Sequence, residues 1–359
     1  MAAKLDNVTD YPHSPNGAVD ERPSARARFP WQPGTATGIG SMPGGNPLEA
    51  ARVIVGELPD FPHLPELPGR GPGADITGRA AALLVDIPTE VTPRGWRIAE
   101  RPGRDFRRAR SYLSADLDAL EEVLDGYEGL LKLQVAGPWT LAATLEQPRS
   151  LNPSLADSGL VADLAASLAE GVANHVAEVA KRLPRATLAV QIDEPALPAV
   201  VAGAVPTASG LGRVRAPDEE FLRERLRQVV TATGGYSIVH CCSRDYPFGV
   251  IRASGARALS LDISQLGTPD YDELAAAAEA GLGLLFGYAE RVGATAKAAA
   301  DSVAEVWRRM AQPPAKCAEQ VVITPACGLA GSSPEQARKT LGLVREAARI
   351  LPELMGELS

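Results

Sequence analysis

The chain has 359 residues, 45% of them hydrophobic, and a formal net charge of -8 at neutral pH. This length allows a large buried core, in one barrel-sized domain or in two or three smaller domains. An acidic chain without a basic block is poorly suited to hold phosphate backbones, so nucleic acid is not expected as a partner. No run approaches 18 apolar residues and the N-terminal stretch has no apolar signal core, so neither a membrane location nor export is expected.

Cysteine and histidine are scarce, with four of each in the chain. A protein without an export signal is expected to be cytoplasmic, where cysteines serve as thiols, metal ligands or nucleophiles and seldom form disulfides. Two of the cysteines and one histidine stand together in SIVHCCSRDY, at 237–246. Three interpretations compete for this stretch: a metal site, a redox pair, or chance neighbours in a buried strand.

Short apolar runs alternate with longer amphipathic stretches along most of the chain. Residues 1–30 lack this pattern and are interpreted as a flexible N-terminal tail, which leaves 31–359 as the folded domain. The expected strands are 34–41, either 60–66 or 82–87, 130–136, 187–192, 236–241, 257–262, 282–287 and 320–324. The expected helices are 46–57, 115–127, 157–182, 217–233, 269–280, 295–311 and 333–350.

Eight strands in alternation with helices predict an α/β fold, namely a single (β/α)8 TIM barrel. An open, doubly wound sheet is the rival architecture. Against it, the glycine-rich stretch GIGSMPGG at 38–45 lacks the G-x-G-x-x-G spacing that dinucleotide-binding folds place after their first strand. The second strand stays ambiguous, because 60–66 is interrupted by prolines, and whichever of the two segments is not the strand belongs to an inserted excursion.

Polar side chains follow the expected strands at the points where a barrel builds its active site. In such barrels the loops after the strand C-termini form the catalytic face, so residues far apart in sequence converge on one rim. The residues at these points are Ser41, Asp193, Glu194, His240, Cys241, Cys242, Asp262 and Cys327.

The fifth expected strand separates the two adjacent cysteines. Successive side chains of a strand point to opposite faces, so His240 and Cys242 share one face and Cys241 lies on the other. With His240 and Cys242 at the barrel mouth, Cys241 packs toward the helices and a vicinal disulfide is not expected. Cys327 and the carboxylate of Asp262 reach the same rim, which completes a candidate zinc site. Spacing alone leaves open that these cysteines are small buried apolar side chains.

Five longer stretches carry most of the distinctive residues. They are TATGIGSMPGGNP (35–47), VAGPWTLAATL (135–145), QIDEPAL (191–197), IVHCCS (238–243) and TPACGLAG (324–331). In this order they resemble the catalytic, C-terminal barrel of cobalamin-independent methionine synthase, across most of the chain from residue 31. The resemblance implies a zinc enzyme that transfers a methyl group to the thiol of homocysteine and so makes methionine.

The resemblance also implies residue roles. Zinc would be held by His240, Cys242 and Cys327, with the homocysteine thiol entering an exchangeable position. Asp193 would meet the amino group of the substrate, and Ser41 with its neighbouring backbone would meet the carboxylate.

Two departures from the family pattern bear on these roles. The usual fourth protein ligand is a glutamate on the sixth strand, and the nearest residue here is the shorter Asp262. Full-length members have two barrels, the first of which helps to bind a polyglutamylated folate, whereas this chain resembles the single-barrel branch. The methyl donor is therefore open between methyltetrahydrofolate and a corrinoid protein. The sequence is also compatible with a thiol acceptor other than homocysteine, or with a non-catalytic zinc-binding barrel related to uroporphyrinogen decarboxylase.

The Pro-rich stretch DFPHLPELPGRGPGAD at 60–75 resembles a segment that follows the second strand in single-barrel relatives. This favours 60–66 as the strand and brings Glu66, as a substrate-binding candidate, and Arg70 near the mouth. The alternative is a stiff surface loop whose path the prolines fix. Glu194 is interpreted as structural and Cys317 as a loop thiol. The remaining histidines, which have no ligand-like neighbours, are His13, His63 and His175.

Overall fold

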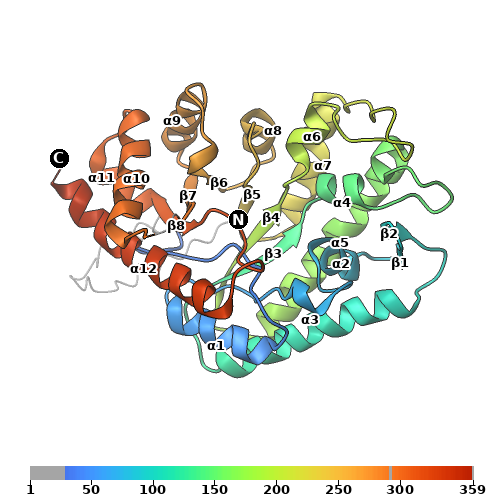
Figure 1. The fold of residues 1–359 in the computed structure, drawn as a ribbon, viewed down its shortest axis with the longest axis horizontal. Helices are drawn as coiled ribbons and strands as arrows, with labels where there is room; N and C mark the ends of the chain where they lie inside the picture. The colour runs from blue at the N-terminus through green and yellow to red at the C-terminus, as the bar shows by residue number, and fades with distance from the viewer. Residues whose placement is uncertain (1–28, 291–292, 358–359) are drawn as a thin grey trace, which may run out of the picture.

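The computed structural model describes residues 29–290 and 293–357, which form one α/β domain. A six-stranded parallel sheet lies at the centre with helices ranged around it, and its strands follow one another in chain order (Figure 1). Each strand coincides with a predicted one to within about one residue at either end. The strands are β3 (Leu130–Ala136), β4 (Thr187–Asp193), β5 (Tyr236–Cys241), β6 (Ala258–Asp262), β7 (Gly283–Tyr288) and β8 (Val321–Pro325).

Two extended segments, 34–41 and 60–66, run where the first two strands of a full barrel were expected. They are joined to β8, to β3 and to each other by isolated parallel bridges and not by regular ladders. The fold is therefore a six-stranded half-barrel with two bridged segments, and the prediction of eight regular strands holds only in part. The bridges are Ala36 to Ile323, Ser41 to Glu66, and His63 to Lys132.

The composition of these segments explains their irregularity. Pro62 and Pro65 remove two N–H donors from the second segment, and glycines at 34, 38 and 40 weaken the first. The alternative second strand, 82–87, is wrong. Its first residues end helix α2 (Ile76–Leu83) and the rest is a turn in which Asp86 has a φ of 58°.

Seven long helices match the predicted ones. In α12 the local signals act as expected, because Ser333 caps the helix by accepting from the backbone N–H of Gln336, and Pro334 is its first residue. The second of the seven, α3, begins eleven residues earlier than predicted, since its polar, arginine-rich first half gives little apolar signal. These helices are α1 (Pro47–Glu57), α3 (Arg104–Val123), α5 (Ser158–Arg182), α7 (Glu219–Ala232), α9 (Asp270–Ala280), α10 (Ala296–Arg309) and α12 (Pro334–Gly356).

The sequence did not predict the short elements. Cys317 is a buried residue of one of them, a short helix, so its interpretation as a loop thiol is wrong. Besides α2, they are the hairpin β1 (Thr89–Thr92) and β2 (Gly95–Ile98) and the helices α4 (Pro138–Thr144), α6 (Leu197–Val201), α8 (Phe248–Ala253) and α11 (Pro314–Gln320).

The inner face of the half-barrel is divided into an apolar end and a polar end. Near the N-terminal ends of the strands, Phe29, Trp31 and Phe61 pack against small and aliphatic side chains from all six strands. Phe29 stacks on Trp31 with ring centroids 5.4 Å apart, so aromatic side chains fill part of this end. The other face of the sheet packs on the helices. Polar inward-facing side chains are thus left at the C-terminal ends of the strands.

Residues 1–28 of the predicted tail, with His13, lie outside the described residues. Within the described ranges, no helix combines the length and apolarity needed to cross a membrane.

Candidate metal and substrate site

Two cysteines from separate strands of the sheet meet at its C-terminal edge. Cys242 directly follows β5 and Cys327 follows β8, and their Sγ atoms lie 3.5 Å apart although 85 residues separate them in sequence. Both are free thiols. Two thiolates bound to one tetrahedral zinc at about 2.3 Å each would have their sulfurs about 3.8 Å apart. The observed spacing is close to that value.

The same contact makes the two thiols unequal. Hydrogen bonding with Cys242 lowers the pKa of the Cys327 thiol to about 6. The same bond, with burial, raises the pKa of Cys242. At neutral pH the pair therefore resembles a thiolate that accepts a hydrogen bond from a thiol, and only one further proton must leave before both sulfurs can bind a cation.

His240 lies two residues before Cys242 and is buried, at 3% exposure. Its Nδ1 atom is 2.9 Å from the hydroxyl of Ser260, while its buried Nε2 atom has no hydrogen-bond partner among the described residues. Burial, followed by the positive charge of Lys132, lowers the pKa of His240 to about 3, so the ring is neutral. A neutral ring held at one nitrogen and free at the other has the form of a metal-bound histidine.

Asp262 ends β6 close enough to Cys327 for its charge to act on that thiol's pKa. Its carboxylate is engaged locally, because Oδ1 accepts from the backbone N–H of Ser264 at 2.8 Å and Oδ2 from Gln265 at 3.4 Å. It thereby caps a short 3-10 helix, Ile263–Gln265. Reaching a metal would require a change in this cap.

The donor set fits zinc in kind, with two thiols, a histidine with a free nitrogen and a nearby carboxylate. The fit in geometry is incomplete, since no three His, Cys, Asp or Glu side chains of the described residues are already grouped as a metal cage. Cysteine side chains turn about a single torsion, so either thiol can change its direction without movement of the backbone.

Asp193 and Glu66 supply two carboxylates close to each other, and the charge of Cys327 also acts on Asp193. Asp193 is the last residue of β4, and Glu66 ends the second extended segment. Burial raises the pKa of both side chains. The charge of Glu66 raises the pKa of Asp193 further, whereas Arg79 lowers that of Glu66. The charge of Lys132 lowers the pKa of both carboxyl groups, so a cationic group beside them favours their ionised forms.

Ser41 touches the loop that carries Cys327. The backbone carbonyl of Ser41 accepts from the N–H of Leu329 at 2.8 Å. Its hydroxyl occupies the space where a Cβ atom on residue 328 would lie, so Gly328 is required for this approach. Of the predicted site residues, the structure thus brings Cys242 and Cys327 into direct contact and places Ser41 against the Cys327 loop.

Two predicted residues have structural surroundings. Glu194 accepts from the backbone N–H groups of Trp139 and Thr140, at 3.0 and 2.7 Å, and so caps the start of α4. The Cβ atom that Gly137 lacks would collide with this carboxylate. Cys241 is fully buried against the helix layer, on the opposite face from His240.

Arg70 and Arg79 both contact the carboxylate of Asp116, and Arg79 also contacts Glu66. Arg79 lies 3.4 Å from Glu66 and 2.6 Å from the buried Asp116, to which Arg70 also donates at 2.8 Å. Sequence reasoning placed Arg70 near the mouth but missed Arg79 and Asp116, which lie on helices and carry no strand-end signal.

Sequence reasoning also missed Lys132, Gln134 and Gln191, which face the barrel interior from the middle of β3 and β4. A signal existed: each interrupts an apolar run, and the pairs at 132 and 134 and at 191 and 193 keep the two-residue period of one strand face.

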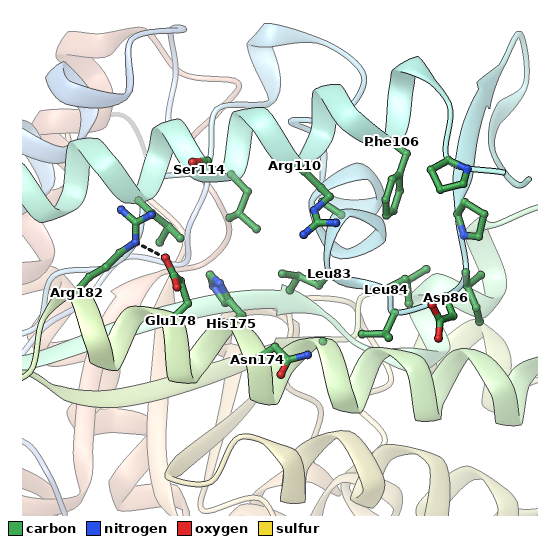
Figure 2. A pocket seen from close by; sticks show the side chains of 18 residues that line it. Leu83, Leu84, Asp86, Phe106, Arg110, Ser114, Asn174, His175, Glu178 and Arg182 are labelled. Carbon is green, nitrogen blue, oxygen red and sulfur yellow. Dashed lines mark hydrogen bonds and ion pairs between the residues drawn. The ribbon is translucent and has the colours of Figure 1, made fainter.

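A cavity of about 600 Å³ lies elsewhere, between α3 and α5 (Figure 2). Figure 2 shows Arg110 pointing into it from α3 and His175 from α5, and Asn174 of α5 also lines it. None of the predicted site residues lines it. A smaller cavity, of about 460 Å³, is lined by Cys327, Tyr288 and Lys339 and so adjoins the candidate site.

Comparison with protein families shows which family the chain belongs to. The family described as cobalamin-independent synthase, catalytic domain, matches residues 151–350, more than half of the chain. The chain belongs to this family. The matched range contains Asp193 and the four candidate metal ligands, whereas Ser41 and Glu66 lie before it.

Solved structures match only distantly, and no curated protein matches the chain. Mandelate oxidase with 3,3-difluoro-2-hydroxy-3-phenylpropionic acid is 15% identical over 87% of this chain and 95% of its own, with a TM-score of 0.31. Mandelate oxidase with benzoyl-formic acid is 15% identical over 87% and 94%, with a TM-score of 0.30. A putative lactate oxidase of Pediococcus acidilactici is 10% identical over 90% and 93%, also with a TM-score of 0.30. Such scores carry no argument about function.

Proposed function

We propose that this chain is a zinc-dependent methyltransferase that methylates the sulfur of a small thiol, with homocysteine as the acceptor and methionine as the product. The observation that carries the proposal is the pair of thiols 3.5 Å apart, beside a buried histidine with a free Nε2 atom. Family membership supports methionine synthase-like chemistry for this site.

His240, Cys242 and Cys327 are the residues that would hold zinc, and Asp262 could join them only after leaving its cap on Ser264. Zinc bound there would supply a nucleophile, because a coordinated thiol is deprotonated at neutral pH and keeps a reactive sulfur. The neutral state of His240, which its burial enforces, leaves its nitrogen lone pair free for a metal.

Two carboxylates orient the acceptor. Asp193 and Glu66 form the anionic side of the site and would receive the ammonium group of an amino-acid thiol. Ser41, which abuts the Cys327 loop, would donate to its carboxylate. An acceptor fixed at both groups presents its sulfur for in-line attack on the methyl carbon. One S–C bond forms, the donor–methyl bond breaks, and the thiol proton leaves to solvent.

Methionine formation from homocysteine tests the reaction, with methylcobalamin and triglutamyl methyltetrahydrofolate offered in parallel as donors. We expect the corrinoid-borne methyl group to serve better, because a chain of net charge -8 disfavours a polyglutamate tail. Turnover with the folate at about 1 per second or faster would overturn the donor preference and leave the thiol chemistry standing.

Two competing functions are separated by offering a panel of other small thiols as acceptors alongside homocysteine. A transferase for another thiol would hold zinc but would leave homocysteine unmethylated with either donor. A non-catalytic barrel related to uroporphyrinogen decarboxylase would methylate no thiol at all, so its bound zinc would have no chemical consequence.

A further inference from the structure

A lysine is buried in the interior of the half-barrel, where charged side chains are rare. Lys132, in the middle of β3, is fully shielded from solvent. Its Nζ atom donates to the backbone carbonyl of Ile39 at 2.8 Å and to Oε1 of Gln191 at 2.6 Å. Neither contact is an ion pair, so a simple salt bridge does not explain why the charge is there.

The contact with Lys132 determines which way the amide of Gln191 faces. An amide has one acceptor end and one donor end, and Lys132 engages the acceptor end. The donor end must then face the opposite way, where Nε2 donates to Ile39 O at 2.9 Å and to Oδ1 of Asp193 at 2.7 Å. If the amide turned over, two acceptors, Oε1 and Oδ1, would face each other.

Asp193 receives the end of this chain of hydrogen bonds. Its Oδ1 atom accepts a hydrogen bond from Gln191. Its Oδ2 atom has no hydrogen-bond partner among the described residues, and it is not one of their fully buried, unpaired polar atoms. One oxygen is therefore held and the other is left for a ligand. Ile39, which accepts from both Lys132 and Gln191, lies two residues before Ser41, so the same bonds tie the first extended segment to β3 and β4.

We propose that Lys132 is a positioning residue that acts through Gln191 to hold Asp193 in the orientation that receives the acceptor's ammonium group. This inference rests on the proposed amino-acid acceptor and deepens it. Lys132 touches neither the substrate nor the thiols. Its effect is to lock the amide, and the amide locks the carboxylate.

The positive charge of Lys132 also favours the ionised form of Asp193, the form that would bind an ammonium group. Burial lowers the pKa of Lys132 to about 7, against the opposing influence of Asp193 and then Glu66. Its charge in turn lowers the pKa of both carboxylates. Donation to Gln191 needs only an N–H group, so the amide stays locked whether the lysine is charged or neutral.

The sharpest test is Gln191→Glu, because it removes the donation to Asp193 while a carboxylate still accepts from Lys132. We expect the KM for homocysteine to rise about tenfold or more with bound zinc unchanged, since a charge-linked buried hydrogen bond is lost. Gln320→Glu is the matched control. Gln320 is a buried amide in α11 that donates to Ala278 O and Leu282 O, away from the site, so its variant should keep the wild-type KM.

A double-mutant cycle distinguishes a role of Lys132 through its hydrogen bond to Gln191 from a role in which Lys132 only fills space in the core. Lys132→Met should raise the KM for homocysteine more than it lowers kcat, and adding Lys132→Met to Gln191→Glu should raise KM no further, because both changes break the same chain of bonds. Additive effects, or a Lys132→Met variant within twofold of the wild-type KM, would overturn the inference. If Lys132→Met does not fold, Gln191→Glu decides alone: a wild-type KM overturns the relay.

Homocysteine binding by the wild-type chain shows whether a negative result contradicts the proposed function or only this inference. A wild-type chain that does not bind homocysteine would overturn the proposed acceptor and the inference with it. A wild type that binds homocysteine, with variants that bind it equally well, would overturn the inference alone.

Discussion

The C-terminal edge of the sheet and the cavity between α3 and α5 each contain a buried histidine in polar surroundings. At the edge, His240 has one nitrogen on Ser260, its other nitrogen free, and two thiols on neighbouring loops. In the cavity, His175 faces Leu83 and the charged side chains of Arg110 and Glu178 (Figure 2). The two histidines are similarly buried, and His240 differs in standing two residues before one of the paired thiols.

These two regions differ in the volume of their cavities and in the groups that they offer to a ligand. At about 600 Å³ the cavity is within the range of ligand pockets. Arg182 donates to Glu178 there at 2.7 Å, and Arg110 lies over the ring of Phe106. At the sheet edge, groups with capacity to bind remain: two thiols, a free imidazole nitrogen and an unbonded carboxylate oxygen. For this reason the proposed function is assigned to the sheet edge and not to the cavity.

The largest expected effect is loss of the metal from the sheet edge. Cys242→Ser and Cys327→Ser should each lose most of about one zinc per chain, because a serine hydroxyl is a far weaker zinc ligand than a thiolate. Metal analysis of protein purified without chelators measures this. Stoichiometric zinc in either variant would mean that the thiol pair is not the metal site.

Cys241→Ser is the matched control for that experiment, since it makes the same change one residue away on the opposite face of β5. We expect it to keep its zinc and to lose some stability, because the side chain is buried against helices. Equal loss of zinc from Cys241→Ser and Cys242→Ser would refute the assignment of faces.

Asp193→Asn should have the next largest effect, on substrate and not on metal. Loss of a charge-assisted hydrogen bond to an ammonium costs about 1.5–3 kcal/mol, so kcat/KM for homocysteine should fall about ten- to a hundredfold. Steady-state assays at fixed zinc content check this. An unchanged kcat/KM would point to another substrate or another pose.

The strands of the fold could be predicted from the sequence, and the two irregular segments could not. Apolar runs of five to seven residues located β3 to β8. In 60–66 and 34–41, prolines and glycines reduced the predicted strands to bridges, which a hydrophobic pattern does not register. Short helices such as α4 were missed because seven residues are too few to establish a helical period.

The positions of the candidate site residues could be predicted where they depend on strand ends, and not where they depend on strand interiors or local caps. Alternation assigned His240 and Cys242 to one face and Cys241 to the other. Lys132 was missed because attention to strand ends passes over mid-strand residues. The engagement of Asp262 with its own loop depends on backbone geometry after the strand, which residue type alone does not reveal.

Substitution of His175, the histidine in the cavity, should have the smallest effect on catalysis. Its effect should appear only in how the free energy of unfolding depends on pH. Burial, and then the charge of Arg79, lower the pKa of His175 from 6.5 to about 4, while Glu178 opposes them. As pH falls from 6.5 the unfolded chain takes up this proton before the folded one. The stability contributed by neutral His175 is therefore complete above pH 6.5 and is lost as pH falls toward 4.

His175→Leu removes this titration, so its free energy of unfolding should fall less than that of the wild type between pH 6.5 and 4, by at most about 3 kcal/mol. Denaturant unfolding at several pH values measures the difference, and His63 and His240, present in both proteins, cancel from it. Zinc content and methionine formation should stay at wild-type levels, because no candidate site residue lines the cavity. Loss of either would show that the cavity and the sheet edge are coupled, and the contrast drawn between the two buried histidines would fail.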